Sequence, residues 1–402
     1  MRVLSRRQLA LGAAAGVLAA PSIGRAQMPG ITASEIKLGQ TMPYSGPASA
    51  YGAVGRAEGA YFAMVNDQGG VNGRKVNLLS LDDGYAPAKT VEATRRLVEE
   101  DQVACIFAAL GTAPNSAIAK YLHQKGVPSL FVGSGAAKWG DHVTYPWCMA
   151  GPPSYRIEAA VYAKYILAQK PDAKIAIIWQ NDDLGKDYVL GLKDVLTGAK
   201  EKQLVGSVSY EVTDATVDSQ AISLKASGAD ACITAATPKF AAQFIRKIFD
   251  IDWHPMHFLS NASMGVAAVL KPAGVEKSLG LMSATYFKDP NDPAWKNDPG
   301  MNAFRAMMAK YLPGSDATDA AYLSGYGWAV MMHQTLKQCG NDLSRENLMR
   351  QASNLHDLEV GVWLPGIKVN TAPTQHNPIS QLQMERFNGT SLELFGPMIN
   401  AV

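Results

Sequence analysis

The chain has little cysteine and little charge of either sign. Its 402 residues include four cysteines, and none belongs to a C-x-x-C pair. A thioredoxin-type redox site or a cysteine-built metal site is therefore not expected. Charged residues make up 18% of the chain, and 37 Lys and Arg against 35 Asp and Glu leave a net charge of +2. This balance provides no basic face for nucleic acid, so we expect no DNA or RNA partner.

Several catalytic motifs are also missing. The sequence has no G-x-S-x-G nucleophile elbow and no G-x-x-x-x-G-K-[ST] phosphate loop, which argues against an α/β-hydrolase and an ATPase. Gly133–Gly135 begins like a dinucleotide-binding fingerprint, but Lys138 stands where the third glycine belongs. His254 and His257 form an H-x-x-H pair without a nearby third ligand, so a surface or core role is expected. We therefore expect no catalytic residue, no cofactor and no metal.

The first 26 residues have the three parts of an export signal. An arginine-containing start precedes the apolar run Leu9–Ala20, and small residues follow in Gly24–Ala26. The run is shorter than the roughly 20 residues that cross a bilayer, so we expect cleavage after Ala26 rather than a membrane anchor. Ser5–Leu9 resembles a twin-arginine motif, which indicates export in the folded state. No cysteine directly follows the apolar run, so the mature protein is expected to be free in the periplasm.

The remaining chain alternates short β-branched runs with longer amphipathic runs. Hydrophobic residues make up 47% of the sequence, which is typical of a folded globular protein, and its length suits two domains. The first series, up to about residue 150, consists of Ile36–Met42, Tyr51–Gln68, Val76–Leu81, Ala88–Glu99, Cys105–Ala109, Asn115–Gln124 and Ser129–Val132. The second consists of Tyr155–Gln169, Lys174–Trp179, Gly185–Ala199, Leu204–Tyr210, Ser219–Ala226, Ala231–Ala235 and Phe240–Phe249. Alternation of this kind predicts two α/β lobes, each with a largely parallel sheet.

The order of elements changes after residue 280. A strand is predicted over Leu281–Tyr286, and long helices follow over Pro299–Tyr311 and Asp319–Gln338. The tail Ile379–Phe395 has the pattern of two strands around Asn388-Gly389, which is a hairpin signal. These late elements must pack on sheets that already exist, so we expect two lobes that the chain visits more than once.

Three loops at predicted strand ends of the first lobe are rich in glycine and hydroxyl residues. They are Tyr44–Pro47, Gly111–Pro114 and Gly133–Ala136, and each precedes a predicted helix. Open α/β sheets bind ligands at the carboxyl ends of their strands, and N–H groups at a helix start together with hydroxyls can hold a carboxylate. The same residues also serve as ordinary helix caps and turns, and composition alone does not choose between these interpretations.

Stretches spread over nearly the whole mature chain match a known pattern. They are Ile36–Met42, Ser45–Pro47, Tyr51-Gly52, Asn66–Gly73, Asp82-Asp83, Ala163–Tyr165, Ile175–Asp187, Ser227–Asp230 and Tyr322–Ala329. Together they resemble the leucine/isoleucine/valine-type periplasmic binding proteins of ABC transporters. The resemblance implies an α/β fold of two Rossmann-like lobes, joined by three crossovers, with the ligand in the cleft between them. It places residues 27–150 plus 285–364 in the N-terminal lobe and residues 151–284 plus 365–402 in the C-terminal lobe.

The resemblance also implies where the ligand binds. In the first lobe the carboxylate is expected at the loops Gly111, Thr112, Ala113 and Ser134, Gly135, Ala136, with Ser45 nearby and Tyr51 placed over the ligand. In the second lobe the matching positions are Leu184, Ala236, Thr237, Asn261 and Ala262, and Tyr155 reaches the cleft after the first crossover. Tyr44, Tyr286 and Phe287 are further aromatic candidates that have core-packing alternatives.

The sequence departs from the amino-acid binders of this family at several positions. Such proteins place an acid near Ala262 to neutralise the α-ammonium of the ligand, and Leu184 and Ala236 stand where they have tyrosines. A buried ammonium without a counter-charge is costly, so these departures favour an aromatic or branched aliphatic acid without an amino group. Asp182 or Asp183, if it faces the cleft, restores an amino acid. The disulfide common in the family is also lost, because it requires cysteines at Tyr85 and Gly111.

The expected function is capture and delivery without catalysis. We expect a monomeric receptor that closes around a small carboxylate and presents it to the membrane permease of an ABC transporter. The same fold serving as a ligand sensor is the alternative, and a periplasmic enzyme is a weaker one. A repressor is disfavoured, because an export signal stands where a DNA-binding head should precede the first lobe.

Overall fold

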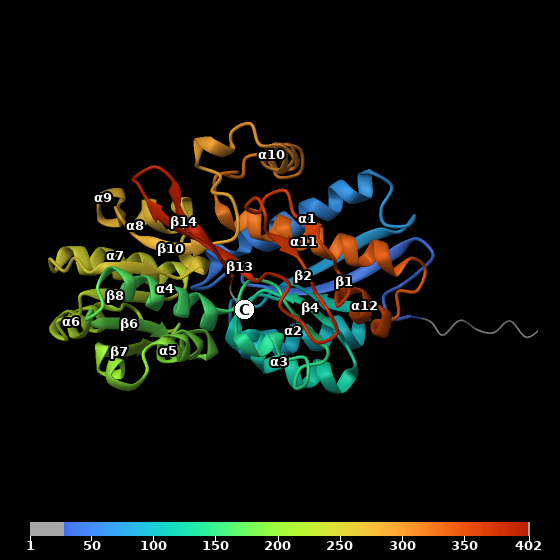
Figure 1. Cartoon of the computed structure of the whole chain (residues 1–402). Helices are drawn as coiled ribbons and strands as arrows, with labels where there is room; N and C mark the ends of the chain where they lie inside the picture. Colours follow the sequence, from blue (N-terminus) through green and yellow to red (C-terminus); the bar gives the residue numbers. More distant parts are fainter. Residues whose placement is uncertain (1–27, 401–402) are drawn as a thin grey trace, which may run out of the picture.

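The computed structural model describes residues 28–400, so the expected export signal lies outside the described residues. Two separate sheets form two lobes that meet in the middle of the molecule (Figure 1). We call the part built on the five-stranded sheet the first lobe and the part built on the seven-stranded sheet the second lobe. The α/β fold of two Rossmann-like lobes predicted from the sequence is confirmed.

The first sheet has the order β2-β1-β3-β4-β5, and all neighbouring strands are parallel. Its strands are β1 (Glu35–Met42), β2 (Lys75–Asp82), β3 (Cys105–Phe107), β4 (Ser129–Val132) and β5 (Cys148–Ala150). The helices α1 (Gly52–Asp67), α2 (Pro87–Arg95) and α3 (Thr112–Lys125) connect them. Because a crossover helix joins parallel strands, the loops that end β1, β3 and β4 lie at one edge of the sheet.

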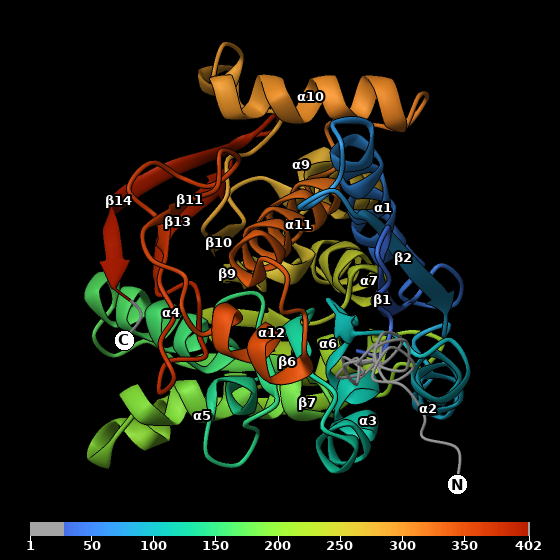
Figure 2. The same ribbon diagram turned by 90° about the vertical axis from the view of Figure 1, so that its right-hand side faces the viewer.

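A late segment of the chain returns to the first lobe. It contains α10 (Pro299–Tyr311), α11 (Ala320–Cys339) and α12 (Arg345–Ala352). Helices α10 and α11 both pack on α1, and α10 lies on the outside (Figures 1 and 2). Gly325 permits the close approach of α11 to α1, since a Cβ there would lie 2.2 Å from the carbonyl oxygen of Val54. The ring of Tyr61 meets that of Tyr326 edge-on at 5.2 Å between centroids.

The second sheet has the order β14-β13-β10-β9-β8-β6-β7. Its parallel strands are β6 (Ile175–Gln180), β7 (Leu204–Tyr210), β8 (Ala231–Ala235), β9 (Met256–Leu259) and β10 (Met282–Thr285). The predicted hairpin forms from β13 (Gln381–Phe387) and β14 (Leu392–Asn400), and β13 pairs antiparallel with β10. The last strand packs against α4, where the Phe395 ring meets that of Tyr165 at 5.6 Å between centroids (Figure 2).

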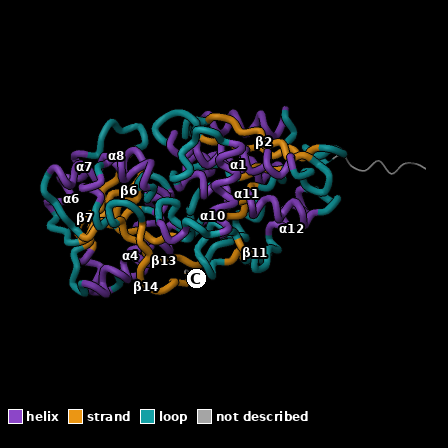
Figure 3. The backbone as a smooth tube through the Cα atoms, turned by 90° about the horizontal axis from the view of Figure 1, so that it is seen from above, coloured by secondary structure: helices purple, strands orange, loops and turns teal. Residues whose placement is uncertain are grey.

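Helices cover both faces of the second sheet, as the tube view from above shows (Figure 3). They are α4 (Tyr155–Gln169), α5 (Asp183–Val195), α6 (Asp218–Ala226) and α7 (Pro238–Asp250), followed by the short α8 (Lys271–Ala273) and α9 (Val275–Ser278). Ile175 and Ile177 of β6 belong to the core under α4 and α5, whereas Ala176 and Ile178 belong to the core under α6 and α7. Successive residues of a strand point to opposite faces, so a strand buried on both faces has a continuous apolar sequence.

Smaller features complete the fold. The strands β11 (Leu358–Glu359) and β12 (Lys368–Val369) pair with each other. All four cysteines are buried and unpaired, and no helix within residues 28–400 is long and apolar enough to cross a membrane.

The segment Gly151–Ser154 leads from β5 of the first sheet directly into α4 of the second lobe. Its two prolines suit an extended link, because proline is not tolerated inside a helix.

Candidate functional site

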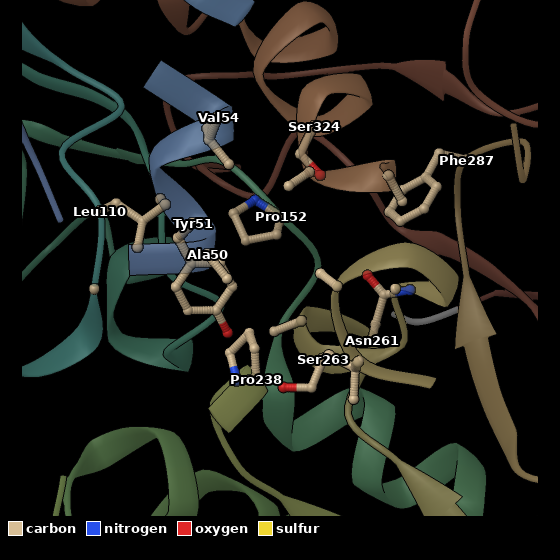
Figure 4. Close-up of a pocket in the computed structure, with 18 of the residues that line it drawn as sticks. Ala50, Tyr51, Val54, Leu110, Pro152, Pro238, Asn261, Ser263, Phe287 and Ser324 are labelled. Atoms are coloured by element: carbon tan, nitrogen blue, oxygen red, sulfur yellow. The ribbon is translucent and has the colours of Figure 1, made fainter. Parts of the chain in front are cut away.

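A cavity lies between the two lobes, where the carboxyl ends of strands from both sheets face each other. The loops after β1, β3 and β4 line it from the first lobe, and those after β6, β8 and β9 line it from the second. The segment after β5, the start of α11 and the segment after β10 close its sides (Figure 4). Its volume of about 100 Å³ exceeds the roughly 10–15 Å³ that one water needs. The cavity therefore has room for a small organic molecule.

The cavity wall is mainly aromatic and apolar. Six aromatic side chains contribute to it, namely Tyr51, Tyr85, Tyr155, Tyr286, Phe287 and Trp328. Glu158 and Asp319 are the carboxyl side chains of the lining, and the lining holds no lysine, arginine or histidine within the described chain. An anionic ligand group must therefore be held by hydrogen-bond donors rather than by a cation.

The first-lobe end of the cavity carries such donors at the start of α3. Gly111, with φ +110°, precedes the helix, and the hydroxyls of Thr112 and Ser134 lie 2.8 Å apart. The first N–H groups of a helix have no intrahelical acceptor, and the helix dipole favours negative charge there. Gly111 and Gly133 line the cavity, while Thr112 and Ser134 are buried directly beside them in sequence. This end of the cavity is suited to a carboxylate.

The structure brings some of the predicted site residues to the cavity and leaves others outside its lining. The lining includes Tyr51, Gly111, Tyr155, Leu184, Asn261 and Ala262. It does not include Ser45, Thr112, Ala113, Ser134, Gly135, Ala136, Ala236 and Thr237. Ser45 is exposed, and its N–H donates to the Asp82 carboxylate at 3.1 Å. Among the further aromatic candidates, Tyr286 and Phe287 line the cavity, but the Tyr44 hydroxyl lies 2.7 Å from that of Ser80 instead.

Two of the residues outside the lining support residues that line the cavity or lie close to it. Gly135 lets Tyr155 approach, because a Cβ on Gly135 would lie 2.8 Å from the Tyr155 ring and 2.5 Å from the Pro153 carbonyl oxygen. The Tyr155 N–H donates to the Gly135 carbonyl at 2.8 Å. In the second lobe the Thr237 N–H donates to the Tyr210 hydroxyl at 2.9 Å. These positions act on the cavity through their neighbours.

Sequence reasoning missed Glu158, a buried acid on the cavity wall. Its carboxylate accepts from the Asn261 N–H at 2.7 Å and from the Tyr162 hydroxyl. Burial raises the pKa of Glu158 to about 7, although the hydrogen bonds from Tyr162 and Asn261 oppose the shift. An acid therefore does lie next to the Asn261-Ala262 turn, but it comes from α4. Its spacing of three residues from Tyr155 on one helix face was the signal available in the sequence.

The two acids at the start of α5 are engaged elsewhere. The Asp182 carboxylate accepts from the Gln180 side-chain nitrogen at 2.7 Å and from the Leu184 N–H at 2.9 Å, so it caps the helix. Asp183 forms an ion pair with Lys138 of the first lobe at 2.7 Å. Neither acid belongs to the cavity lining.

Tyr85 and Gly111, where the family disulfide would need cysteines, are neighbours in space. A Cβ on Gly111 would lie 2.6 Å from Cε2 of Tyr85, so the tyrosine ring packs directly on the glycine. Tyr85 has a positive φ of +62°, and its N–H donates to the buried Asp83 carboxylate at 2.9 Å. The pair thus replaces a covalent link by aromatic packing, and it adds a ring to the cavity wall.

Several hydrogen bonds and an ion pair join the lobes beside the cavity. The Gln180 side chain donates to the Tyr85 hydroxyl at 3.3 Å, and the Ala137 N–H donates to the Asp187 carboxylate at 2.7 Å. The Lys138–Asp183 ion pair also links the two lobes. On the cavity wall, Tyr51 of the first lobe points its hydroxyl toward Ser263 of the second (Figure 4). The lobes are therefore in contact across the site.

Two lobes in contact around an aromatic cavity, with its walls shared between them, define a ligand-binding protein. The chain matches the periplasmic binding protein family over residues 35–390, and it belongs to that family. It is 26% identical over 345 residues to Leu/Ile/Val-binding protein homolog 7 of Brucella abortus (strain 2308). The alignment covers 82% of this chain and 83% of that protein.

Solved structures agree with this assignment at the level of the fold. A branched chain amino acid ABC transporter from Thermus thermophilus with bound valine has a TM-score of 0.82 at 16% identity, covering 92% of this chain and 97% of that one. The solute binding protein of an ABC transporter from R. palustris in complex with benzoate has a TM-score of 0.76 at 18% identity, covering 91% of this chain and 98% of that one. Both alignments span both lobes.

Proposed function

We propose that this protein captures a small carboxylate with an aromatic or branched aliphatic body in the periplasm and delivers it to the permease of an ABC importer. The observation that carries the proposal is the interlobe cavity, which combines an aromatic wall with the start of α3. Burial of an apolar body against the rings supplies affinity. The N–H groups at the start of α3 orient the carboxylate, and the Thr112 and Ser134 hydroxyls are buried behind them.

The similar proteins make both an amino acid and a simple aromatic acid reasonable candidates. One solved structure of this fold holds valine and another holds benzoate. The acids near the cavity favour a ligand without an α-ammonium group. Glu158 is bonded to Asn261 and Tyr162, Asp182 caps α5, and Asp319 accepts from the Ala321 N–H at 3.0 Å. Burial raises the pKa of Glu158 to about 7, so this acid is only partly ionised near neutral pH and is a weak counter-charge for an ammonium.

Delivery follows from the way the ligand would link the lobes. A ligand shifts the equilibrium between open and closed forms only if it contacts the closed form better. A molecule in this cavity touches both walls at once, so it favours closure about the segments that join the lobes. The closed form would then be recognised by the permease.

The test is a thermal-shift screen of refolded, ligand-stripped mature protein. Each α-amino acid is paired with its 2-oxo and des-amino analogue, and benzoate and phenylacetate are included. A ligand at 100 times its dissociation constant adds about 2.7 kcal/mol of stability, so binding is readily detected. The proposal predicts that the acids without an amino group raise the melting temperature. If only amino acids do so, the ligand class is wrong; if no acid does so, the proposed function is wrong.

A further inference from the structure

The turn that leads into α2 has a tyrosine where glycine is usual. Gly84 and Tyr85 are its two central residues, with φ of +57° and +62°. The Ala86 N–H closes the turn by donating to the Asp83 carbonyl oxygen at 2.9 Å. Turns with positive φ at both central positions favour glycine, asparagine or aspartate, because a larger side chain is strained there. A tyrosine at such a position therefore points to a use for its side chain.

Buried hydrogen bonds hold this turn in place. The Asp83 carboxylate accepts from the Tyr85 N–H at 2.9 Å and from the Thr90 hydroxyl at 2.8 Å. A carboxylate that binds the N–H group two residues further along the chain fixes a local turn. Asp83 is fully buried and Tyr85 is 4% exposed. The turn thus gives the Tyr85 ring a fixed direction, toward the cavity that the ring lines.

The side chain of Tyr85 contacts both lobes. In the first lobe its ring packs on Gly111, where an added Cβ would lie 2.6 Å from Cε2 of the ring. At the other end, the Tyr85 hydroxyl accepts from the side-chain nitrogen of Gln180, in the second lobe, at 3.3 Å. One rigid side chain therefore connects the loop at the expected carboxylate end of the cavity with the opposite lobe.

Further hydrogen bonds fix the position of Gln180 in the second lobe. Its side-chain nitrogen also donates to Asp182 at 2.7 Å, and Asp182 accepts from the N–H of Leu184, which lines the cavity. Its side-chain oxygen accepts from the Tyr210 hydroxyl at 3.2 Å. The side chain of Gln180 is buried, so it presents a fixed donor to Tyr85. This hydrogen bond exists only while the two lobes are in contact.

We propose that Tyr85 is a positioning residue that connects the carboxylate loop with the closed form and thereby slows release of the ligand. The inference rests on the proposed function and goes beyond it, because it assigns part of the lifetime of the closed form to one side chain. An interaction that is made only in the closed form favours that form. It slows opening of the lobes, but it does not speed the encounter of a ligand with the open form.

The experiment measures the two rate constants of binding separately. Stopped-flow fluorescence follows ligand-stripped mature protein mixed with benzoate, phenylacetate or 4-methylpentanoate, with Trp328 on the cavity wall as the fluorophore. Tyr85→Phe keeps the ring on Gly111 and removes the hydroxyl. We expect the dissociation rate constant to rise about three- to tenfold, as the loss of one hydrogen bond predicts. The association rate constant should change by less than about twofold.

A double variant tests whether the effect passes through Gln180. Gln180→Met removes the donor, so adding Tyr85→Phe to it should change the dissociation rate constant by less than about twofold. Tyr61→Phe is the matched control, because Tyr61 is 6% exposed and does not line the cavity. Its hydroxyl lies 3.0 Å from Nδ1 of His333, within the first lobe, so both rate constants should stay at their native values.

The outcomes separate this inference from the proposed function. The melting temperature of each ligand-free variant checks its folding. Equal dissociation from Tyr85→Phe and the native protein, a change confined to the association rate constant, an equal rise in Tyr61→Phe, or additive effects in the double variant overturns the inference and leaves the proposed function standing. Failure of all three acids to bind the native protein overturns the proposed function, and the inference with it.

Discussion

The two lobes contribute different kinds of chemistry to the cavity. Besides the rings of Tyr51 and Tyr85, the first lobe presents glycines and the N–H groups of a helix start, with the Thr112 and Ser134 hydroxyls behind them. The second lobe presents side chains, including Glu158, Leu184 and Asn261. Backbone donors at a helix start suit any carboxylate, whereas side chains can differ from protein to protein without disturbing the fold. We infer that the first lobe holds the group that all ligands share and that the second lobe, with α11, selects among them.

The largest effect is expected at the first-lobe glycine. Gly111→Ala would place a Cβ 2.6 Å from the Tyr85 ring at a φ of +110°, so both strain and overlap oppose it. Each effect costs about 1–3 kcal/mol. We expect binding to be lost and the melting temperature to fall. Gly69→Ala is the control, since Gly69 has a φ of +102° but nothing within 4 Å of the added Cβ. An equal loss of stability in both variants would show that backbone strain alone is responsible.

The second prediction compares two buried glutamates, one in each lobe. Burial raises the pKa of Glu158 to about 7, above its ordinary value of 4.5, so the folded state holds a proton that the unfolded state releases. The contribution of Glu158 to the free energy of unfolding is therefore fully present below about pH 4.5. Roughly 3 kcal/mol of it is lost as the pH rises to about 7. Glu158→Gln should flatten the unfolding free energy over this range when denaturant melts are compared with those of the native sequence.

Glu58 is the buried glutamate of the first lobe with which Glu158 is compared. It is fully buried, its partner is Gln40, and burial raises its pKa well above the ordinary value. Glu58 does not line the cavity, so Glu58→Gln should alter stability without altering the pH dependence of ligand affinity. Glu158→Gln should alter both. An identical pH profile of affinity in the two variants would contradict the division of roles between the lobes.

The third prediction concerns the hydroxyl pair of the first lobe. Thr112→Val and Ser134→Ala each remove a donor at the expected carboxylate end. The two hydroxyls are buried behind the lining and bond to each other, so each change leaves a buried hydroxyl without this partner at a cost of about 1–3 kcal/mol, and binding should weaken severalfold. Calorimetry on a series of acids checks the result. The loss should be similar for every acid that binds, and a loss that depends on the body of the ligand would count against a shared carboxylate site.

The smallest effect is expected at the ion pair between the lobes. Lys138 and Asp183 lie 2.7 Å apart, and both are partly exposed, so the pair is worth about 1 kcal/mol or less. Lys138→Met should weaken ligand binding two- to fivefold, with a smaller difference at high salt. Lys186→Met is the control, because Lys186 contacts the same acid at 3.8 Å from within α5. If both variants bind equally, the contact does not stabilise the closed arrangement.

The sequence predicted the elements of the fold well, because apolar periodicity and turn residues are local properties. The runs at 36–42 and 76–81 became β1 and β2, and Asn388-Gly389 became the turn between β13 and β14. The α/β alternation likewise predicted two largely parallel sheets. It did not predict that the terminal hairpin extends the second sheet from β10, since antiparallel pairing depends on which sheet edge is free.

The sequence by itself therefore determined the fold class, the family and the loops that carry backbone donors, because each depends on residues close together along the chain. Only the tertiary structure decided which side chains share the cavity. Tyr85 packs on Gly111, Glu158 reaches the Asn261 turn, and Trp328 faces the same cavity from a helix of the first lobe. These residues lie far apart in sequence, and no local pattern records which of them the fold brings to one cavity.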